Sequence, residues 1–176
     1  YAREEVKLCI NFLRVVANPS DSLSLYYLVS SEIYKVDLAD LTLGNHLARR
    51  RNISLYSVFC DLEKTPELTQ VKDETKEKIK KVLEDLEEFL KVSRDETTGR
   101  LLYSFLTATG YLKYLTADPS LEKETKIQNI AKFFNQVRNY ELIAKEDRVI
   151  SFIKHLNLLI DSGDDPPTVE ADLDQD

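Results

Sequence analysis

The chain has 176 residues, of which 43% are apolar and 31% charged, enough length and apolar content for a globular core. Only 4 Gly and 5 Pro occur, which is few for an all-β fold with many tight turns. Seven of the 31 acidic residues lie in 161–176, so residues 1–160 hold 24 acidic residues against 24 Lys and Arg. A neutral body excludes a general electrostatic pull on nucleic acid, and DNA binding would need a local patch.

Apolar residues at helical spacing predict an all-α, irregular multi-helix domain of about seven or eight helices over residues 1–160. The predicted helices cover 3–17, 22–31, 38–51, 55–64, 67–92, 101–110, about 119–142 and 146–160, with a short aromatic segment at 111–115 and a loop at 95–100. Asp21 or Ser22, Asp37 and Ser54 are the expected N-caps of three of them. Residues 161–176 are expected to be an acidic linker.

Cys9 and Cys60 fit no metal or redox spacing, and both lie in apolar stretches. We expect two reduced, buried thiols in a cytoplasmic protein. No apolar run approaches the roughly 20 residues that a membrane span needs, so no membrane partner is expected. The chain opens in a helical pattern without Met or a signal peptide, which we interpret as an excised piece of a longer protein.

No catalytic or cofactor site is predicted within this chain. The four glycines are too scattered to cradle a phosphate, and the two histidines, His46 and His155, have no Glu or Cys partner at metal-ligand spacing. The acids Glu84, Glu87 and Glu88 alternate with lysines on a long helix, which is typical of a solvated face. We therefore expect no enzyme activity from the chain on its own.

Two features could contact nucleic acid. The run Arg49, Arg50 and Arg51 ends the third helix, where cations suit the helix dipole but could also reach a phosphate backbone together with Lys35 and His46. The aromatic residues Tyr103, Phe105, Tyr111 and Tyr114 could stack bases, yet their helical spacing in an apolar segment is more typical of a core.

The first helices resemble the accessory 2B subdomain of UvrD/Rep/PcrA-type superfamily 1 DNA helicases. The pattern R-x-E-I/V-K, an apolar run and N-P-x-D is matched by Arg3, Glu5, Val6, Lys7, Phe12, Leu13, Arg14, Asn18, Pro19 and Asp21. Weaker similarities follow in the same order at "TGYLKYL", "KIQNIAKFFNQVRNYE", "VISFIKHLNLLID" and "TVEADLDQD". The resemblance therefore spans nearly the whole chain.

This resemblance implies a helical insertion in the second RecA-like domain of a motor that couples ATP hydrolysis to 3′→5′ movement on DNA. ATP and Mg²⁺ would bind the parent outside this fragment. The insertion would swivel, tune unwinding in DNA repair or replication, and contact duplex or forked DNA, the remainder of the motor and a regulatory protein. A helicase–nuclease parent fits equally. A stand-alone helical adaptor for protein partners is the alternative from a different class.

The stretch "SEIYKVDLADLTLGNH" occupies the place of the family's glycine-rich duplex-binding turn, T-P-x-R-G-I-G. Lys35, Val36 and Asp37 stand at the G-I-G positions, so the apolar middle is kept and both glycines are replaced. Asp37 would put a carboxylate where a phosphate docks and would cap the following helix itself. We expect conformational regulation or protein contact rather than a strong grip on duplex.

Overall fold

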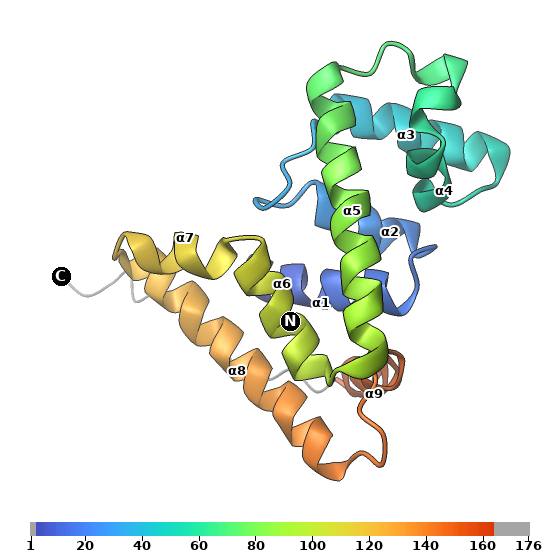
Figure 1. Cartoon of the computed structure of the whole chain (residues 1–176). Coiled ribbons are helices and arrows are strands. Elements are labelled where there is room, and N and C mark those ends of the chain that lie inside the picture. Colours follow the sequence, from blue (N-terminus) through green and yellow to red (C-terminus); the bar gives the residue numbers. More distant parts are fainter. Residues whose placement is uncertain (1–2, 164–176) are drawn as a thin grey trace. The chain divides into compact units, whose positions relative to one another are not determined.

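The computed structural model describes residues 3–163, and every regular element in that range is helical (Figure 1). The α-helices are α1 (Glu4–Ala17), α2 (Ser22–Val29), α3 (Leu38–Arg51), α4 (Leu55–Cys60), α5 (Asp73–Asp95), α6 (Thr98–Ala108), α7 (Tyr111–Ala117), α8 (Leu121–Ile143) and α9 (Val149–Asp161), and the 3-10 helices η1 (Leu62–Lys64) and η2 (Pro66–Leu68) lie between α4 and α5. The all-α class is confirmed for this range. It contains nine α-helices rather than seven or eight, because the aromatic segment forms a separate α7 after the left-handed Gly110.

The chain divides into two compact units. Unit 1 comprises Tyr1–Ile10 and Ser93–Asp176, and unit 2 comprises Asn11–Val92. The divisions fall inside α1 and α5, so unit 2 is one continuous stretch of sequence and unit 1 combines two separate stretches. The expected boundary between a domain (1–160) and an acidic linker (161–176) stays a prediction. Asp161 still belongs to α9, and residues 164–176 lie outside the described range.

Unit 2 packs the second half of α1 with α2 to α5. Phe12 meets Phe89 edge to face, with ring centroids 5.3 Å apart, and both side chains are buried. Around them the core is formed by Leu13, Val16, Leu25, Leu28, Leu41, Leu55, Val58, Phe59, Val82 and Leu86. Gly44 of α3 faces α4, and a Cβ there would make an ordinary van der Waals contact, 3.7 Å from a methyl of Leu55.

Unit 1 is built on α8, which packs along α6 and α7 (Figure 1). Its core contains Leu101, Leu102, Phe105, Leu106, Tyr111, Leu115, Ile130, Phe133, Val137, Phe152 and Leu156. Phe152 of α9 contacts the rings of Phe133 and Tyr140, with centroids 6.2 and 5.5 Å away. His155, a candidate that we dismissed as a metal ligand, lies 4.8 Å from the Tyr140 ring and is half-buried.

The expected local caps are confirmed. Asp21 accepts a hydrogen bond from the amide of Ser24, Asp37 from that of Asp40, and Ser54 from that of Ser57. Each is the short polar side chain that a helix N-terminus prefers. The polar face of α5 is also as expected, because Glu84, Glu87 and Glu88 are all exposed.

Helix boundaries were predicted wrongly at the start of α5 and at the junction of α5 and α6. The long helix begins at Asp73 rather than at residue 67, because the preceding residues form η2 and bury Leu68 and Val71. The predicted loop at 95–100 is nearly absent, since α5 extends to Asp95 and α6 begins at Thr98 under a Thr97 cap. Both boundaries are stabilised by an aspartate from elsewhere in the sequence. Asp40 accepts from the amide of Lys72, and Asp147 from that of Thr98.

Two predictions of burial were wrong in part. Cys9 is buried but Cys60, the last residue of the short α4, is exposed. Phe105 and Tyr111 belong to the core, whereas Tyr103 and Tyr114 are 58% and 52% exposed. Tyr114 instead lies under the ammonium of Lys123, 4.3 Å from the ring centroid. Within residues 3–163 no helix is both long and apolar enough to cross a membrane.

Candidate nucleic-acid interface

The turn between α2 and α3 satisfies its own backbone amides. The amide of Lys35 donates to the carbonyl of Ser31 at 2.8 Å, and that of Val36 donates to the carbonyl of Val29 at 3.0 Å. Val36 is buried, so the apolar middle of the turn anchors it in unit 2. Neither of these two amides is free to bind a phosphate.

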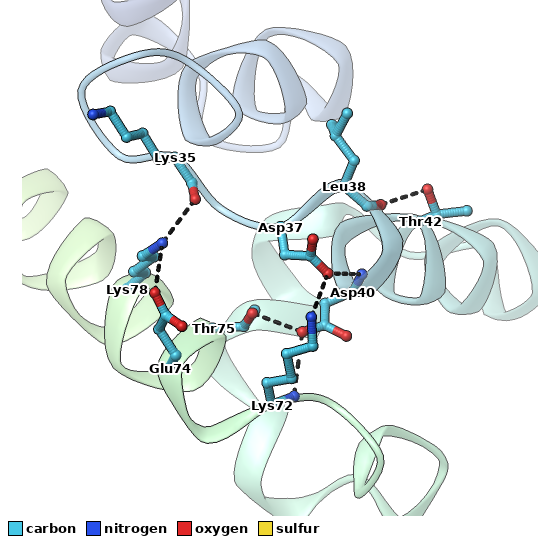
Figure 2. Close-up of polar contacts among 9 residues, drawn as sticks. All are labelled: Lys35, Asp37, Leu38, Asp40, Thr42, Lys72, Glu74, Thr75 and Lys78. Carbon is cyan, nitrogen blue, oxygen red and sulfur yellow. Dashed lines mark hydrogen bonds and ion pairs between the residues drawn. The ribbon is translucent and has the colours of Figure 1, made fainter.

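Lys35 adopts the backbone conformation that glycine favours. Its φ is +53°, and within residues 3–163 only Asn52 among the other non-glycine residues shares a positive value. The left-handed region costs an ordinary L-residue about 1 kcal/mol or more. The Lys35 side chain extends away from the turn, while its carbonyl faces α5 and accepts a 2.9 Å hydrogen bond from Lys78 (Figure 2).

Asp37 closes the N-terminus of α3 with its own carboxylate. Its Oδ2 accepts from the amide of Asp40 at 3.3 Å and lies 3.5 Å from the ammonium of Lys72 (Figure 2). This carboxylate occupies the end of the helix where an anion would otherwise bind. Its φ is −59°, which any residue adopts, so this position has no conformational need for glycine.

Behind the turn lies a buried carboxylate, Asp40, that no pattern in the sequence indicated. Asp40 is 8% exposed, and its Oδ2 accepts from Thr75 Oγ1 at 2.6 Å and from the amide of Lys72 at 3.2 Å (Figure 2). These two hydrogen bonds therefore connect α3 to the start of α5 behind the turn. Asp40 carried no sequence signal for this contact, because its partners lie 32 and 35 positions away.

The three arginines at the end of α3 lie in different surroundings. Arg51 forms a 2.6 Å ion pair with Glu67, whereas Arg49 and Arg50 are exposed and make no ion pair with residues 3–163. The pKa of Glu67 is held below its ordinary value because its carboxylate accepts hydrogen bonds from the Glu67 backbone amide and from Arg51. Arg51 is thereby engaged within the protein, which leaves two cations for an external anion.

His46 and Arg49 line one hollow, and Lys35 does not. The hollow has a volume of about 560 Å³ and lies between α2 and α3. From Lys35 to Arg49 the chain runs the length of α3, roughly 20 Å at 1.5 Å per residue. The structure thus brings together two of the expected DNA-contacting residues and leaves the turn as a separate feature. Within residues 3–163, no group of three or more His, Cys, Asp or Glu side chains could hold a metal ion.

Comparison with known proteins assigns the chain to a family. A sequence model of the UvrD-like helicase C-terminal domain matches residues 1–167. The chain belongs to this family. The resemblance to UvrD-type helicases is thus confirmed at the level of the family.

Two relatives of this UvrD-like domain are ATP-dependent DNA helicases named PcrA. The chain is 24% identical over 166 residues to PcrA of Staphylococcus epidermidis strain RP62A, and the match covers 92% of the chain and 22% of that protein. It is 26% identical over 168 residues to PcrA of Staphylococcus aureus strain Mu50, with the same two shares. The chain therefore spans 22% of the length of these relatives.

Proposed function

We propose that this chain is the 2B-type accessory domain of a UvrD-type, ATP-dependent 3′→5′ DNA helicase, with a regulatory and DNA-positioning role in repair or replication. The family match over residues 1–167 carries the proposal. In it, residues 1–160 form the accessory domain and 161–176 lead back to the motor. ATP and Mg²⁺ would bind in the motor, which would carry the hydrolase activity. The motor would also be the main binding partner of this domain.

The turn and the arginines support a weak rather than a strong contact with duplex or forked DNA. Asp37 places a negative charge at the end of α3, and the amides of Lys35 and Val36 are already used. The cations available to a phosphate backbone are few, because Arg51 is paired and the body of the chain is neutral. Electrostatic DNA affinity grows with the number of phosphates neutralised, so a few cations give little.

The flanking reading frame tests the assignment directly. A UvrD-type parent must encode a G-x-x-x-x-G-K-S/T phosphate-binding motif well before Tyr1 and a V-x-I/V/L-x-T/S-x-H-x-A/S-K-G-L-E/D motif soon after Asp176. If both motifs are absent, the helicase proposal is wrong. The stand-alone adaptor then becomes the better description.

Deleting the domain from the parent tests its role. We expect a parent with a short linker in place of residues 1–160 to keep ATP hydrolysis stimulated by single-stranded DNA and to change its rate of duplex unwinding. Loss of ATP hydrolysis in a folded variant would mean that the domain is part of the motor. An unchanged unwinding rate would contradict a regulatory role.

Binding by the isolated chain tests the expected weakness of the DNA contact. With a duplex of about 20 base pairs in ~150 mM salt, we expect no binding at submicromolar concentration. Submicromolar affinity would show that the chain grips duplex without the glycine turn. Membership of the family would be unaffected by that result.

A further inference from the structure

A groove between α2 and α3 in unit 2 combines exposed apolar side chains with a cation that makes no ion pair within residues 3–163. Its volume of about 560 Å³ is that of a site for several side chains. The residues that give it its character are Leu23, Tyr26 and Tyr27 from α2, His46 and Arg49 from α3, and Ile53 beyond the end of α3. They come from one side of each helix, at spacings of three or four residues, and so form a continuous lining.

The apolar part of the groove is unusually accessible. Leu23, Tyr27 and Ile53 are 66%, 53% and 42% exposed. Single exposed apolar residues are normal on any protein, but a cluster of large ones along a hollow marks a surface that another molecule covers. The rings of Tyr26 and Tyr27 meet edge to face, with centroids 5.7 Å apart.

The charge of the groove is positive. Arg49 lines it and makes no ion pair with residues 3–163, and no acidic side chain is among the described residues of the lining. Arg51, two residues away, shows the contrasting case, because Glu67 neutralises it at 2.6 Å. In a body with equal numbers of acidic and basic residues, this groove is a local site for a carboxylate.

We propose that the groove docks an amphipathic helix of a separate protein, whose apolar face fills it and whose flanking Asp or Glu pairs with Arg49. Tyr and Arg are the residues that dominate the binding energy of protein interfaces. A helix laid in a groove between two helices presents apolar side chains at the spacing that such a lining accepts.

The same lining is poorly suited to nucleic acid. DNA binding relies on several cations that follow the phosphates, and here one arginine lies among apolar, aromatic and uncharged polar side chains. Leu23 and Ile53 gain from burial only against apolar atoms. The inference does not rest on the proposed function, because the groove would serve a helicase domain and a stand-alone adaptor alike.

A pair of synthetic peptides tests the proposal on the whole chain. The first is an acetylated, amidated helix of about 15 residues with Leu on one face, Glu beside it and Ala elsewhere, and the second has Lys in place of every Glu. We expect the Glu peptide to bind with Kd of about 10–100 µM and the Lys peptide at least about tenfold more weakly. Amide shifts in ¹H–¹⁵N spectra should fall on α2 and α3.

Charge-swapped variants locate the contact. Arg49→Glu should weaken the Glu peptide about tenfold and strengthen the Lys peptide. Arg50→Glu makes the same change of charge one residue away, outside the lining, and should leave both affinities nearly unchanged. Leu23→Ser should weaken the Glu peptide severalfold. Leu38→Ser, at a 58% exposed leucine outside the groove, is its control. Melting curves check that each variant is folded.

Four results would overturn the proposal. The first is that the Glu peptide does not bind at about 1 mM, and the second is that Arg49→Glu and Arg50→Glu weaken its binding equally. The third is that duplex DNA, but not the Glu peptide, shifts the amide signals of α2 and α3. The fourth is that the chain self-associates and Arg49→Glu abolishes this association. The third result would assign the groove to nucleic acid, and the fourth to a second copy of this chain. Both of these outcomes can be recognised whether or not the parent protein is a helicase.

Discussion

The side chain of Asn129 in α8 donates a hydrogen bond of 2.8 Å from Nδ2 to Oε1 of Glu5 in α1, across 124 positions of sequence. Both residues are nearly inaccessible, with 1% and 5% of their surface exposed. Glu5 belongs to the R-x-E-V-K block of the resemblance, and Asn129 to the weaker "KIQNIAKFF" block. Two separate parts of the family pattern therefore meet in one buried pair within unit 1, and their role is structural.

Removing the amide of Asn129 should destabilise the chain strongly. Asn129→Leu keeps a similar volume but withdraws the donor from a buried carboxylate, which then lacks that partner. We expect a loss of about 2–4 kcal/mol in the free energy of unfolding, measured by urea denaturation with circular dichroism. Glu5→Gln keeps an acceptor oxygen without the charge and should lose less than about 1 kcal/mol.

A double replacement measures how much of the stability loss comes from the contact between Glu5 and Asn129 itself. If the two side chains act through each other, Glu5→Leu combined with Asn129→Leu should be less destabilised than the sum of the single losses. Additive losses would mean that each residue is held by other neighbours. A loss under about 0.5 kcal/mol for Asn129→Leu alone would also contradict the structural role, since buried unsatisfied charges are costly.

The stability of the chain should fall at alkaline pH because of Cys9. Burial, and secondarily the charge of Glu5, raise the pKa of the Cys9 thiol from 9.0 to about 12. The folded state therefore keeps a proton that the unfolded state releases, and stability present below about pH 9 is lost as the pH rises toward 12. From this group we expect a loss of about 1 kcal/mol per pH unit above pH 9.

Urea denaturation at about pH 8, 9 and 10 measures this slope. Cys9→Ala should be less stable at pH 8 because a buried side chain is shortened, but its unfolding free energy should change less between pH 9 and 10. Tyr34, whose pKa is raised by burial and by Asp85, contributes only at higher pH. Cys60→Ser is the matched control, since Cys60 is exposed. Equal slopes in wild type and Cys9→Ala would refute the assignment.

Local signals in the sequence predicted much of this fold, because their physical causes are local. The caps at Asp21, Asp37 and Ser54 each act on an amide three residues later, so the residue type and the following apolar pattern were sufficient. The start of α5 was predicted wrongly, and the amide just before it, that of Lys72, donates to Asp40, which lies 32 positions earlier. No local pattern reports a contact that exists only after two distant helices have packed.

The two long-range aspartates should differ in their importance to stability. Asp40 is buried and accepts two hydrogen bonds, from Thr75 Oγ1 and from the amide of Lys72 just before α5, so Asp40→Ala should lose about 2–3 kcal/mol. Asp147 makes the equivalent pair of bonds to Thr98 but is only half-buried, and Asp147→Ala should lose about 1–2 kcal/mol. Urea unfolding of both variants decides the order, and the reverse order would refute this account of burial.

The sequence predicted several residues of the candidate site but not which residues lie together in space. The sequence placed three arginines at the end of α3, as found, but could not show that Glu67 pairs with Arg51 and leaves the other two. It also could not show that Arg49 and His46 share a groove with Leu23 and Tyr27, because those residues lie on another helix. Charge and spacing along one helix are readable, whereas the side chains supplied by its neighbour are not.

Glycine at position 35 should stabilise the chain. Lys35 has a φ of +53°, where a side chain is strained and glycine is not, and its hydrogen bond from Lys78 uses the backbone carbonyl. We expect Lys35→Gly to gain about 0.5–1 kcal/mol in the free energy of unfolding, a gain limited by the greater freedom of glycine in the unfolded chain.

Asn52 provides the matched control for this change. It has the same φ of +53° at the end of α3, but asparagine tolerates the left-handed conformation well. Asn52→Gly should therefore change stability by less than about 0.5 kcal/mol. Thermal or urea unfolding of the two variants gives the comparison. A destabilised Lys35→Gly would show that its side chain contributes more than its backbone strain removes.

Replacing Asp37 by glycine tests whether this turn is a duplex-binding turn that now caps its own helix. Asp37→Gly removes the carboxylate and frees the amide of Asp40, so stability should fall by a few tenths up to about 1 kcal/mol. If the turn retains the geometry for a phosphate, affinity for a duplex of about 20 base pairs should rise severalfold, measured by fluorescence anisotropy at fixed salt. Asp37→Asn removes the charge but keeps a capping oxygen, and Asp118→Asn removes an equal charge in unit 1, outside this turn. If only Asp37→Gly binds duplex more tightly, the result supports a converted duplex-binding turn. If all three variants bind more tightly, the cause is the change in net charge. If none does, Asp37 is a helix cap alone.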